Sequence, residues 1–382
     1  MLTPSRRWDI FCAVVDNYGD AGVAWRLART LATEHRLPVR LYIDAPATLA
    51  RLAPGVDATR AVQRVAGLEL RVWGGPRAPL PGARPAAVVV EAFGCGLPPS
   101  YLEAMAARSR PPVWINLEHL SAEKWIEGCH GLASPHPQLP LTRYFFFPGF
   151  TSASGGLLRE CDLLARRDRF RADPSARASL WRSLGLPPPA PAELAVSLFC
   201  YPSAPVADLL TAWQRGERGV LCLVPPAVAD AALERWTGGA GRRISTRGSL
   251  RLARLPFVPQ DEYDPILWGC DMNFVRGEDS FVRAQWAARP LVWNPYPQAE
   301  DAHRLKLAAF LELYAARLQP RAARVLASFS RAWSGEGNVG GAWTALAGQL
   351  PDIAANAEAW AAALGRKRDL ATALVKFSLD RL

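Results

Sequence analysis

Residues 257–298 read FVPQDEYDPILWGCDMNFVRGEDSFVRAQWAARPLVWNPYPQ, a segment in which short apolar runs alternate with helix-like stretches. The pattern predicts strand, helix, strand, helix and strand, with the later strands at 271–275 and 290–293 and the later helix over 281–286. Such alternation is typical of a parallel sheet whose strands are joined by crossover helices. The segment therefore predicts an α/β fold.

The turn between the second strand and the second helix of this segment reads RGEDS. Gly277 permits a positive φ and the close approach of a ligand. A helix that begins at Asp279 or Ser280 presents free N–H groups and a positive dipole end, which bind phosphate, and Arg276 adds a cation. Glu278 would repel phosphate but can accept hydrogen bonds from hydroxyls. The corner therefore predicts a nucleotide or nucleotide-sugar site, although simple capping of a helix explains the same residues equally well.

The length of 382 residues favours two domains, and half of the residues are hydrophobic. The proline-rich run at 187–191 is the clearest linker. We therefore expect an N-terminal domain over 1–186 and a C-terminal domain over 187–352. The last helices, at about 353–382, are expected to pack back on the N-terminal domain.

Composition argues against several other classes of protein. No apolar run approaches the roughly 18 to 20 residues that cross a bilayer, and the N-terminus resembles no signal peptide, so a cytoplasmic protein without a membrane partner is expected. The seven cysteines are odd in number and lack CxxC spacing, which disfavours a disulfide framework or a zinc site. The net charge of +10 favours anionic partners, but no nucleic-acid-binding motif is present.

The N-terminal region opens with a βαβ pattern. An apolar run at 8–15 predicts a strand buried on both faces, and a helix over 21–35 and a strand at 39–43 follow. The first loop carries Asp16 and Asp20 where a dinucleotide-binding fold would have glycines. Asp20 is also a plausible N-cap, whereas Asp16 is harder to explain in that way. An acid at each end of a glycine-containing loop suits hydroxyl binding or proton abstraction.

The same alternation continues along the chain. Further strands are predicted at 87–91, 113–117, 144–150, 194–199 and 219–224, and helices near 227–236, 352–364 and 369–379. His119 follows one of these strands, and a lone histidine in such a place is more often structural than catalytic. Two doubly wound, Rossmann-like domains joined by a linker are typical of GT-B glycosyltransferases. In that architecture the domains face a cleft, with the donor nucleotide on the C-terminal domain and the acceptor at the N-terminal domain.

Two stretches resemble the signatures of the EarP family, the protein-arginine rhamnosyltransferases of bacterial elongation factor P. The first is DNYGDAGVAWRLA at 16–28, and the second combines FVPQ at 257–260 with RGEDSFVRAQ at 276–285. The resemblance extends over nearly the whole chain. It implies a GT-B fold and an inverting reaction, in which dTDP-β-L-rhamnose donates rhamnose to an arginine guanidino group of elongation factor P and α-rhamnosyl-arginine forms.

The resemblance also implies roles for individual residues. Asp20 is the expected general base, Asp16 a second essential acid, and Glu278 a third acid at the donor. No metal and no cofactor other than the donor substrate are expected. The expected substrate contacts are Asn17, Tyr18, Gly19, Phe199, Tyr201, Phe257, Gln260, Arg276, Gly277, Asp279 and Ser280. For Phe199 and Tyr201, a place in the ordinary core is an equally good interpretation.

Two other classes of function fit parts of the sequence. A different nucleotide-sugar enzyme, such as an epimerase, would share the donor corner but need no protein acceptor. A basic nucleic-acid-binding protein would bind RNA with an affinity that falls steeply with salt. That second class gives no role to Asp16, Asp20 and Glu278.

Overall fold

The computed structural model describes residues 7–226, 228, 230–239 and 242–382. The sequence predictions that concern the first six residues, and residues 227 and 229 of the helix near 227–236, lie outside this part. The chain forms two compact units, one of residues 1–161 together with 367–382 and the other of residues 162–366. No helix in the described ranges is both long and apolar enough to cross a membrane.

The first unit is built on an eight-stranded sheet with the strand order β3-β4-β2-β1-β5-β6-β8-β7. The strands are β1 (Trp8–Cys12), β2 (Val39–Ile43), β3 (Val62–Val65), β4 (Leu68–Val72), β5 (Val88–Ala92), β6 (Val113–Leu117), β7 (Ala133–Pro135) and β8 (Thr142–Phe146). Only β3 and β7, at the two edges, pair in the antiparallel sense within this sheet as described. The chain order reverses between β1 and β5, which makes their carboxyl ends the topological switch point.

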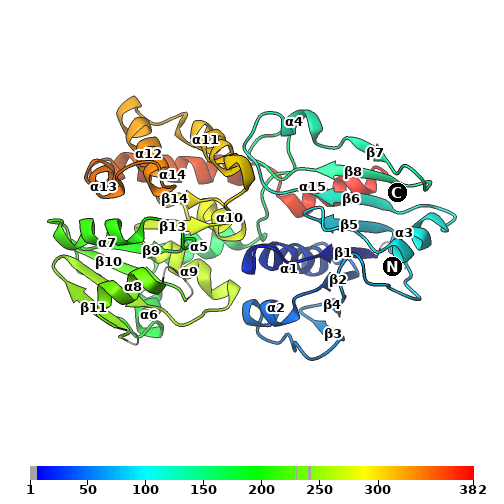
Figure 1. Ribbon diagram of the computed structural model, residues 1–382, viewed down its shortest axis with the longest axis horizontal. Coiled ribbons are helices and arrows are strands. Elements are labelled where there is room, and N and C mark those ends of the chain that lie inside the picture. The colour runs from blue at the N-terminus through cyan, green and yellow to red at the C-terminus, as the bar shows by residue number, and fades with distance from the viewer. Residues whose placement is uncertain (1–6, 227, 229, 240–241) are drawn as a thin grey trace. The chain divides into compact units, whose positions relative to one another are not determined.

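Helices cover both faces of this sheet (Figure 1). They are α1 (Tyr18–Thr33), α2 (Pro46–Leu52), α3 (Pro99–Ala106), α4 (Ile126–Cys129) and α15 (Leu370–Leu379). All residues of β1, β2, β5 and β6 are buried, as expected for strands covered on both faces. Helix α1 packs on β1, β2 and α15, and its Arg26 forms a buried bidentate pair with Glu160, with N–O distances of 2.8 Å. This pair connects the helix to residue 160, near the end of the first chain segment of the unit.

The second unit is built on a six-stranded sheet with the order β11-β12-β10-β9-β13-β14. The strands are β9 (Leu194–Leu198), β10 (Val220–Val224), β11 (Ile244–Arg247), β12 (Leu250–Arg254), β13 (Met272–Arg276) and β14 (Leu291–Asn294). The helices are α5 (Leu163–Ala172), α6 (Pro174–Ser183), α7 (Val206–Arg215), α8 (Asp230–Thr237), α9 (Gln260–Gly269), α10 (Asp279–Ala287), the 3₁₀ turn η2 (Ala299–Asp301), α11 (Ala302–Ala315), α12 (Pro320–Trp333), α13 (Val339–Ala347) and α14 (Leu350–Gly365). The chain order reverses between β9 and β13, so this sheet too is doubly wound.

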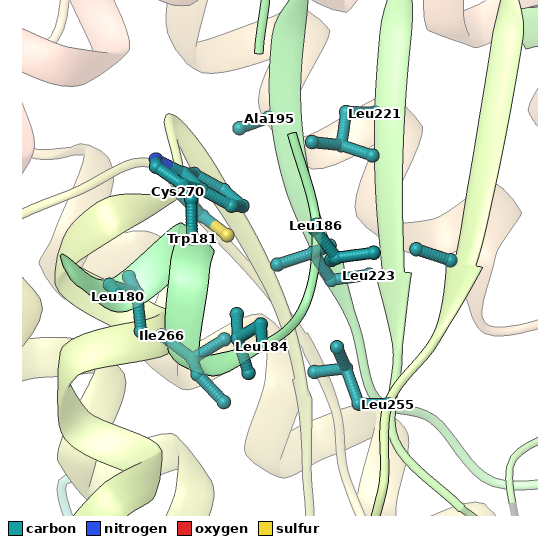
Figure 2. Packing of buried hydrophobic residues seen from close by; sticks show 11 residues of the cluster. Leu180, Trp181, Leu184, Leu186, Ala195, Leu221, Leu223, Leu255, Ile266 and Cys270 are labelled. Atoms are coloured by element: carbon teal, nitrogen blue, oxygen red, sulfur yellow. The ribbon is translucent and has the colours of Figure 1, made fainter. Parts of the chain in front are cut away.

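The structure divides the chain at other residues than the sequence predicted. Figure 2 shows one buried cluster of the second unit, in which Leu180 lies near Ile266 of α9 and Leu186 lies beside Leu223 of β10. Leu180 and Leu186 precede the proline-rich run at 187–191 but already belong to the core of the second unit. The run therefore lies inside that unit and does not separate the domains. At the other end α14 packs on α10 of the second unit, and only α15 returns to the first.

The element boundaries also differ in places that bear on function. Helix α1 begins at Tyr18, three residues before its predicted start, and β1 ends at Cys12 instead of reaching 15. Residues 257–260 contain no strand, because β12 ends at Arg254 and Gln260 already starts α9. The strands predicted at 39–43 and 113–117 are confirmed.

Candidate functional site

Asp20 lies in the first turn of α1, where its side chain organises the loop that precedes the helix. The residue is 5% exposed. Its Oδ2 atom accepts hydrogen bonds from the backbone N–H groups of Val15 and Asp16, both at 2.8 Å. The N-cap position of α1 is held by Asn17, and Asp20 lies inside the first turn of the helix. The alternative interpretation of Asp20 as the N-cap is therefore wrong. A buried carboxylate is thus fixed at the carboxyl end of β1, at the switch point.

The loop between β1 and α1 is held by further contacts of its own. Asn17 adopts a φ of 38°, which is unusual for a residue other than glycine. A Cβ atom on Gly19 would come within 2.7 Å of Asp16 Oδ2, so only glycine leaves the Asp16 carboxylate in its place over the helix start. Asp44, after β2, accepts a hydrogen bond of 2.9 Å from the N–H of Val14. The Tyr18 ring lies 5.8 Å from the Arg51 guanidinium carbon.

In the second unit the RGEDS turn joins β13 to α10. Gly277 has a φ of 57°, and its carbonyl accepts a hydrogen bond of 2.7 Å from Trp293 Nε1. Glu278 occupies the N-cap position without a side-chain cap, and the helix begins at Asp279. The turn therefore has the positive φ that its glycine predicted, and neither Asp279 nor Ser280 is the N-cap.

The side chains of Asp279 and Gln260 are joined in a buried network. Asp279 Oδ2 accepts from Gln260 Nε2 at 2.8 Å and from Arg283 Nε at 3.1 Å, and Arg283 Nη1 lies 2.9 Å from Asp264 Oδ1. Gln260 Oε1 is buried and receives no hydrogen bond from any residue that the structure describes. Sequence reasoning missed Asp264 and Arg283, although the four-residue spacing between Asp279 and Arg283 is a signal for their pairing.

Ser280 is likewise engaged with its own turn. Its hydroxyl donates to the carbonyl of Arg276 at 2.5 Å and accepts from the N–H of Arg276 at 3.1 Å. This arrangement closes the turn around Gly277.

Arg276 lies on two aromatic rings that follow β9. Its guanidinium carbon is 4.3 Å from the Phe199 ring centroid and 4.8 Å from that of Tyr201, and Nη1 donates to the carbonyl of Cys200 at 3.3 Å. Burial raises the pKa of the Cys200 thiol to about 12, an effect that the nearby Arg276 charge opposes. The two rings thus hold the Arg276 cation in a fixed orientation.

Neighbouring strand ends complete this corner of the second unit. The side chain of Asn294, at the end of β14, accepts a hydrogen bond of 2.9 Å from the N–H of Tyr201. Tyr296 packs edge-on against the Tyr201 ring at 5.6 Å. Phe257 is half-buried in the segment that leads into α9. Sequence reasoning did not single out Asn294 or Tyr296, and only their place after a strand marks them.

The structure thus gathers the predicted residues into one group in each unit. Asp16, Asn17, Tyr18, Gly19 and Asp20 share the loop and helix start after β1. The other predicted residues lie at the carboxyl ends of β9 and β13 or at the starts of α9 and α10. In both units the group lies at the switch point, where ligands bind in doubly wound folds.

A cavity of about 360 Å³ in the first unit involves none of the predicted residues. Its wall includes Glu91, Trp114, His136 and Arg143. Glu91 is 1% exposed and accepts hydrogen bonds from the N–H of Gly96 at 2.8 Å and from Trp114 Nε1 at 3.1 Å. These contacts hold the loop that follows β5.

Comparison with known proteins gives consistent matches over the full length. The model of a family described as Elongation-Factor P (EF-P) rhamnosyltransferase EarP matches residues 8–379. The chain is 48% identical over 378 residues to the protein-arginine rhamnosyltransferase of Pseudomonas putida, covering 98% of this chain and 99% of the relative. It is 37% identical over 394 residues to that of Shewanella oneidensis, covering 97% of each.

Solved structures agree with this match. One described as the structural basis for EarP-mediated arginine glycosylation of translation elongation factor EF-P has a TM-score of 0.69 and 36% identity, over 98% of this chain and 99% of that chain. Spinosyn rhamnosyltransferase SpnG complexed with thymidine diphosphate (TM-score 0.56, 14% identity, 98% and 100% covered) and Acinetobacter baumannii MurG (TM-score 0.51, 13% identity, 99% and 100% covered) are more distant. They share the fold alone, which is that of GT-B glycosyltransferases.

Proposed function

The chain belongs to the EarP family and is a glycosyltransferase, and on this premise we propose that it transfers L-rhamnose from dTDP-β-L-rhamnose to an arginine of translation elongation factor P. The reaction inverts the anomeric centre and gives α-rhamnosyl-arginine. The observation that carries the proposal is the buried Asp20 carboxylate, fixed at the switch point of the first unit by two backbone N–H groups. Because the acceptor is a translation factor, we also propose that the protein acts in the cytoplasm.

The donor is proposed to bind at the carboxyl edge of the second sheet. Its diphosphate lies against the N–H groups at the start of α10, beside Gly277, and Arg276 supplies a cation. Glu278 accepts hydrogen bonds from donor hydroxyls. The helix dipole and the guanidinium replace a divalent cation at the leaving diphosphate, so we propose that the reaction needs no metal.

The base of the nucleotide is proposed to lie near Gln260, Phe257 and the rings of Phe199 and Tyr201. Aromatic rings suit a pyrimidine face, and the buried Oε1 of Gln260 suits a ring N–H. A buried acceptor without a partner costs about 1–3 kcal/mol, and a ligand N–H recovers part of that free energy.

The chemistry at arginine demands a carboxylate. A guanidinium has a pKa above about 12 and delocalised lone pairs, so it is a poor nucleophile and is not deprotonated in advance. We assign the acceptance of one proton to Asp20, while the N–C1 bond forms and the C1–O bond breaks with its electron pair leaving on dTDP. Both described hydrogen bonds of Asp20 go to Oδ2, so the proton is assigned to Oδ1. Asp16 orients the guanidinium beside it.

The experiment is intact-mass spectrometry of purified elongation factor P after incubation with this protein and dTDP-rhamnose. We expect a mass increase of one deoxyhexose, and an α linkage by NMR. An acceptor with lysine at the modified arginine is the control and should gain no mass. Absence of the increase with the unaltered acceptor contradicts the function, and a β linkage contradicts the inverting mechanism.

A further inference from the structure

Asn116, on β6, joins two loops at the carboxyl edge of the first sheet. The residue is 3% exposed, and in the β-sheet register it lies opposite Glu91 of β5. Its Oδ1 accepts a hydrogen bond of 3.1 Å from the N–H of Gly94, and its Nδ2 donates one of 2.6 Å to Glu118 Oε1. The half-buried Glu118 carboxylate is therefore held by an amide that the sheet itself fixes.

The loop after β5 is bound to the end of β6 by a second hydrogen bond and by a ring contact. Phe93 directly follows the strand with a φ of 58°, and its N–H donates to the carbonyl of Leu117 at 2.6 Å. A residue other than glycine keeps this conformation only where its surroundings enforce it. The Phe93 ring stacks on His119, with the ring centroids 4.5 Å apart and the planes 12° from parallel. The result is a stacked aromatic pair that links the loop after β5 to the residues that follow β6.

These groups share an edge with the proposed general base. The strand order places β5 beside β1 and β6 beside β5, and all three strands are parallel. Two strand spacings separate β1 from β6 by about 9–10 Å. Glu118 directly follows β6, and Asp20 lies at the start of α1, which follows β1, so both carboxylates belong to the carboxyl edge of one sheet.

We propose that Glu118 binds the acceptor arginine on the side away from Asp20, and that Asn116 positions Glu118 for this purpose. A guanidinium carries five N–H donors, and only one nitrogen becomes the nucleophile. The remaining donors need acceptors, and a carboxylate complements the planar fork of N–H groups on a guanidinium. This assignment rests on the proposed transfer to arginine. It makes Glu118 a determinant of affinity for the acceptor and not for the donor.

The test is steady-state kinetics of the full-length Glu118→Gln variant, with elongation factor P and dTDP-rhamnose varied in turn. Loss of a charged hydrogen-bond partner is expected to raise the acceptor KM by about 10- to 100-fold. Calorimetry should give a donor Kd within about twofold of the wild-type value, because the proposed donor residues lie in the second unit. Glu123→Gln is the matched control, because that nearby carboxylate accepts from Ser121 Oγ at 2.9 Å and has no proposed role. An acceptor KM that stays within about twofold in Glu118→Gln overturns the assignment, and so does an equal loss of donor affinity.

Asn116→Ala tests the positioning role separately. If Asn116 acts through Glu118, the single variant raises the acceptor KM and the double variant is no worse than Glu118→Gln alone. Additive losses overturn the positioning role. Glu118→Asp, which keeps the charge on a shorter side chain, should fall between the wild type and Glu118→Gln, and it provides the measurement if the glutamine variant does not fold. A wild-type protein that transfers no rhamnose contradicts the proposed function itself, a result distinct from all of these.

Discussion

Replacement of Asp20 by asparagine separates proton acceptance from loop structure. The amide oxygen of asparagine can still accept from the N–H groups of Val15 and Asp16, which Oδ2 now binds at 2.8 Å each. Two charged hydrogen bonds become neutral ones, so the loop loses about 1–3 kcal/mol of stabilisation but keeps its partners. Loss of a general base typically lowers the rate by about 10² to 10⁴, which corresponds to about 2.7–5.4 kcal/mol in the barrier. The catalytic loss should therefore exceed the structural one.

The assay for Asp20→Asn pairs two measurements on the same preparation. Calorimetry should show donor affinity within about twofold of the wild-type value, because the predicted donor residues belong to the second unit. The rate of product formation, measured from the intact mass of elongation factor P, should fall by about 10² to 10⁴.

Asp44→Asn is the matched control, because Asp44 binds the N–H of Val14 in the same loop at 2.9 Å. It should cost less than about tenfold in rate, as expected for a change of about 1 kcal/mol in one hydrogen bond. If both variants lose transfer equally, loop order explains the effect and the reasoning about Asp20 is refuted. Transfer by Asp20→Asn at the wild-type rate refutes it as well.

Three further outcomes are expected. Glu278→Ala should bind dTDP-rhamnose about tenfold or more weakly in calorimetry, because it removes hydrogen bonds of a charged acceptor to donor hydroxyls; unchanged affinity and turnover would contradict that placement. Activity should be complete in the presence of a chelator, and a requirement for added magnesium or manganese would disprove metal independence. Glu160→Gln should lower the thermal midpoint strongly, since it leaves the buried Arg26 without its bidentate partner at a cost of about 3 kcal/mol or more. Glu336→Gln, which breaks an exposed pair with Arg304, should shift the midpoint little, and equal shifts would argue against the burial effect.

The parts of the fold that the sequence predicted well are strands buried on both faces. The runs at 39–43 and 113–117 are apolar at four of five positions and follow a proline, so the apolar pattern and the breaker agree on their bounds. The edge strands β3, β7 and β11 were not predicted, because they are short, mostly exposed or half-buried and lack an apolar pattern. Their existence depends on pairing with a neighbour that is already in place.

The domain boundary shows a different limit. A proline-rich run indicates where a chain cannot be regular, but it does not indicate which core the preceding helix joins. Leu180 and Trp181 of α6 join the buried cluster that contains Leu221 and Leu223 of β10, and α6 packs on α9, which no local pattern encodes. The last two helices show the same limit. Both α14 and α15 are largely apolar, but α14 packs in the second unit and α15 in the first.

Candidate site residues could be predicted where they are contiguous in sequence. The loop of 16–20 and the turn of 276–280 each combine a glycine with charged residues directly after a strand, which marks them locally. The link between Gln260 and Asp279 spans 19 positions and depends on α9 packing against α10. Asn116 and Glu118 are only two positions apart. The hydrogen bond that orients the Asn116 side chain, however, comes from Gly94, which is 22 positions away and follows the neighbouring strand β5.

Charge acts at two different ranges in this protein. The net charge of +10 favours the approach of anionic partners, which includes an acidic acceptor protein but not the arginine that it presents. Salt screens exposed charges beyond about 8 Å at physiological ionic strength, so the substrate guanidinium responds to the groups beside it and not to the whole surface. By the assignments proposed above, these groups are the carboxylates of Asp16, Asp20 and Glu118 at the edge of the first sheet. A basic chain therefore accommodates a cationic side chain only where acids gather after neighbouring strands, and their removal should weaken acceptor binding more than any change in distant surface arginines.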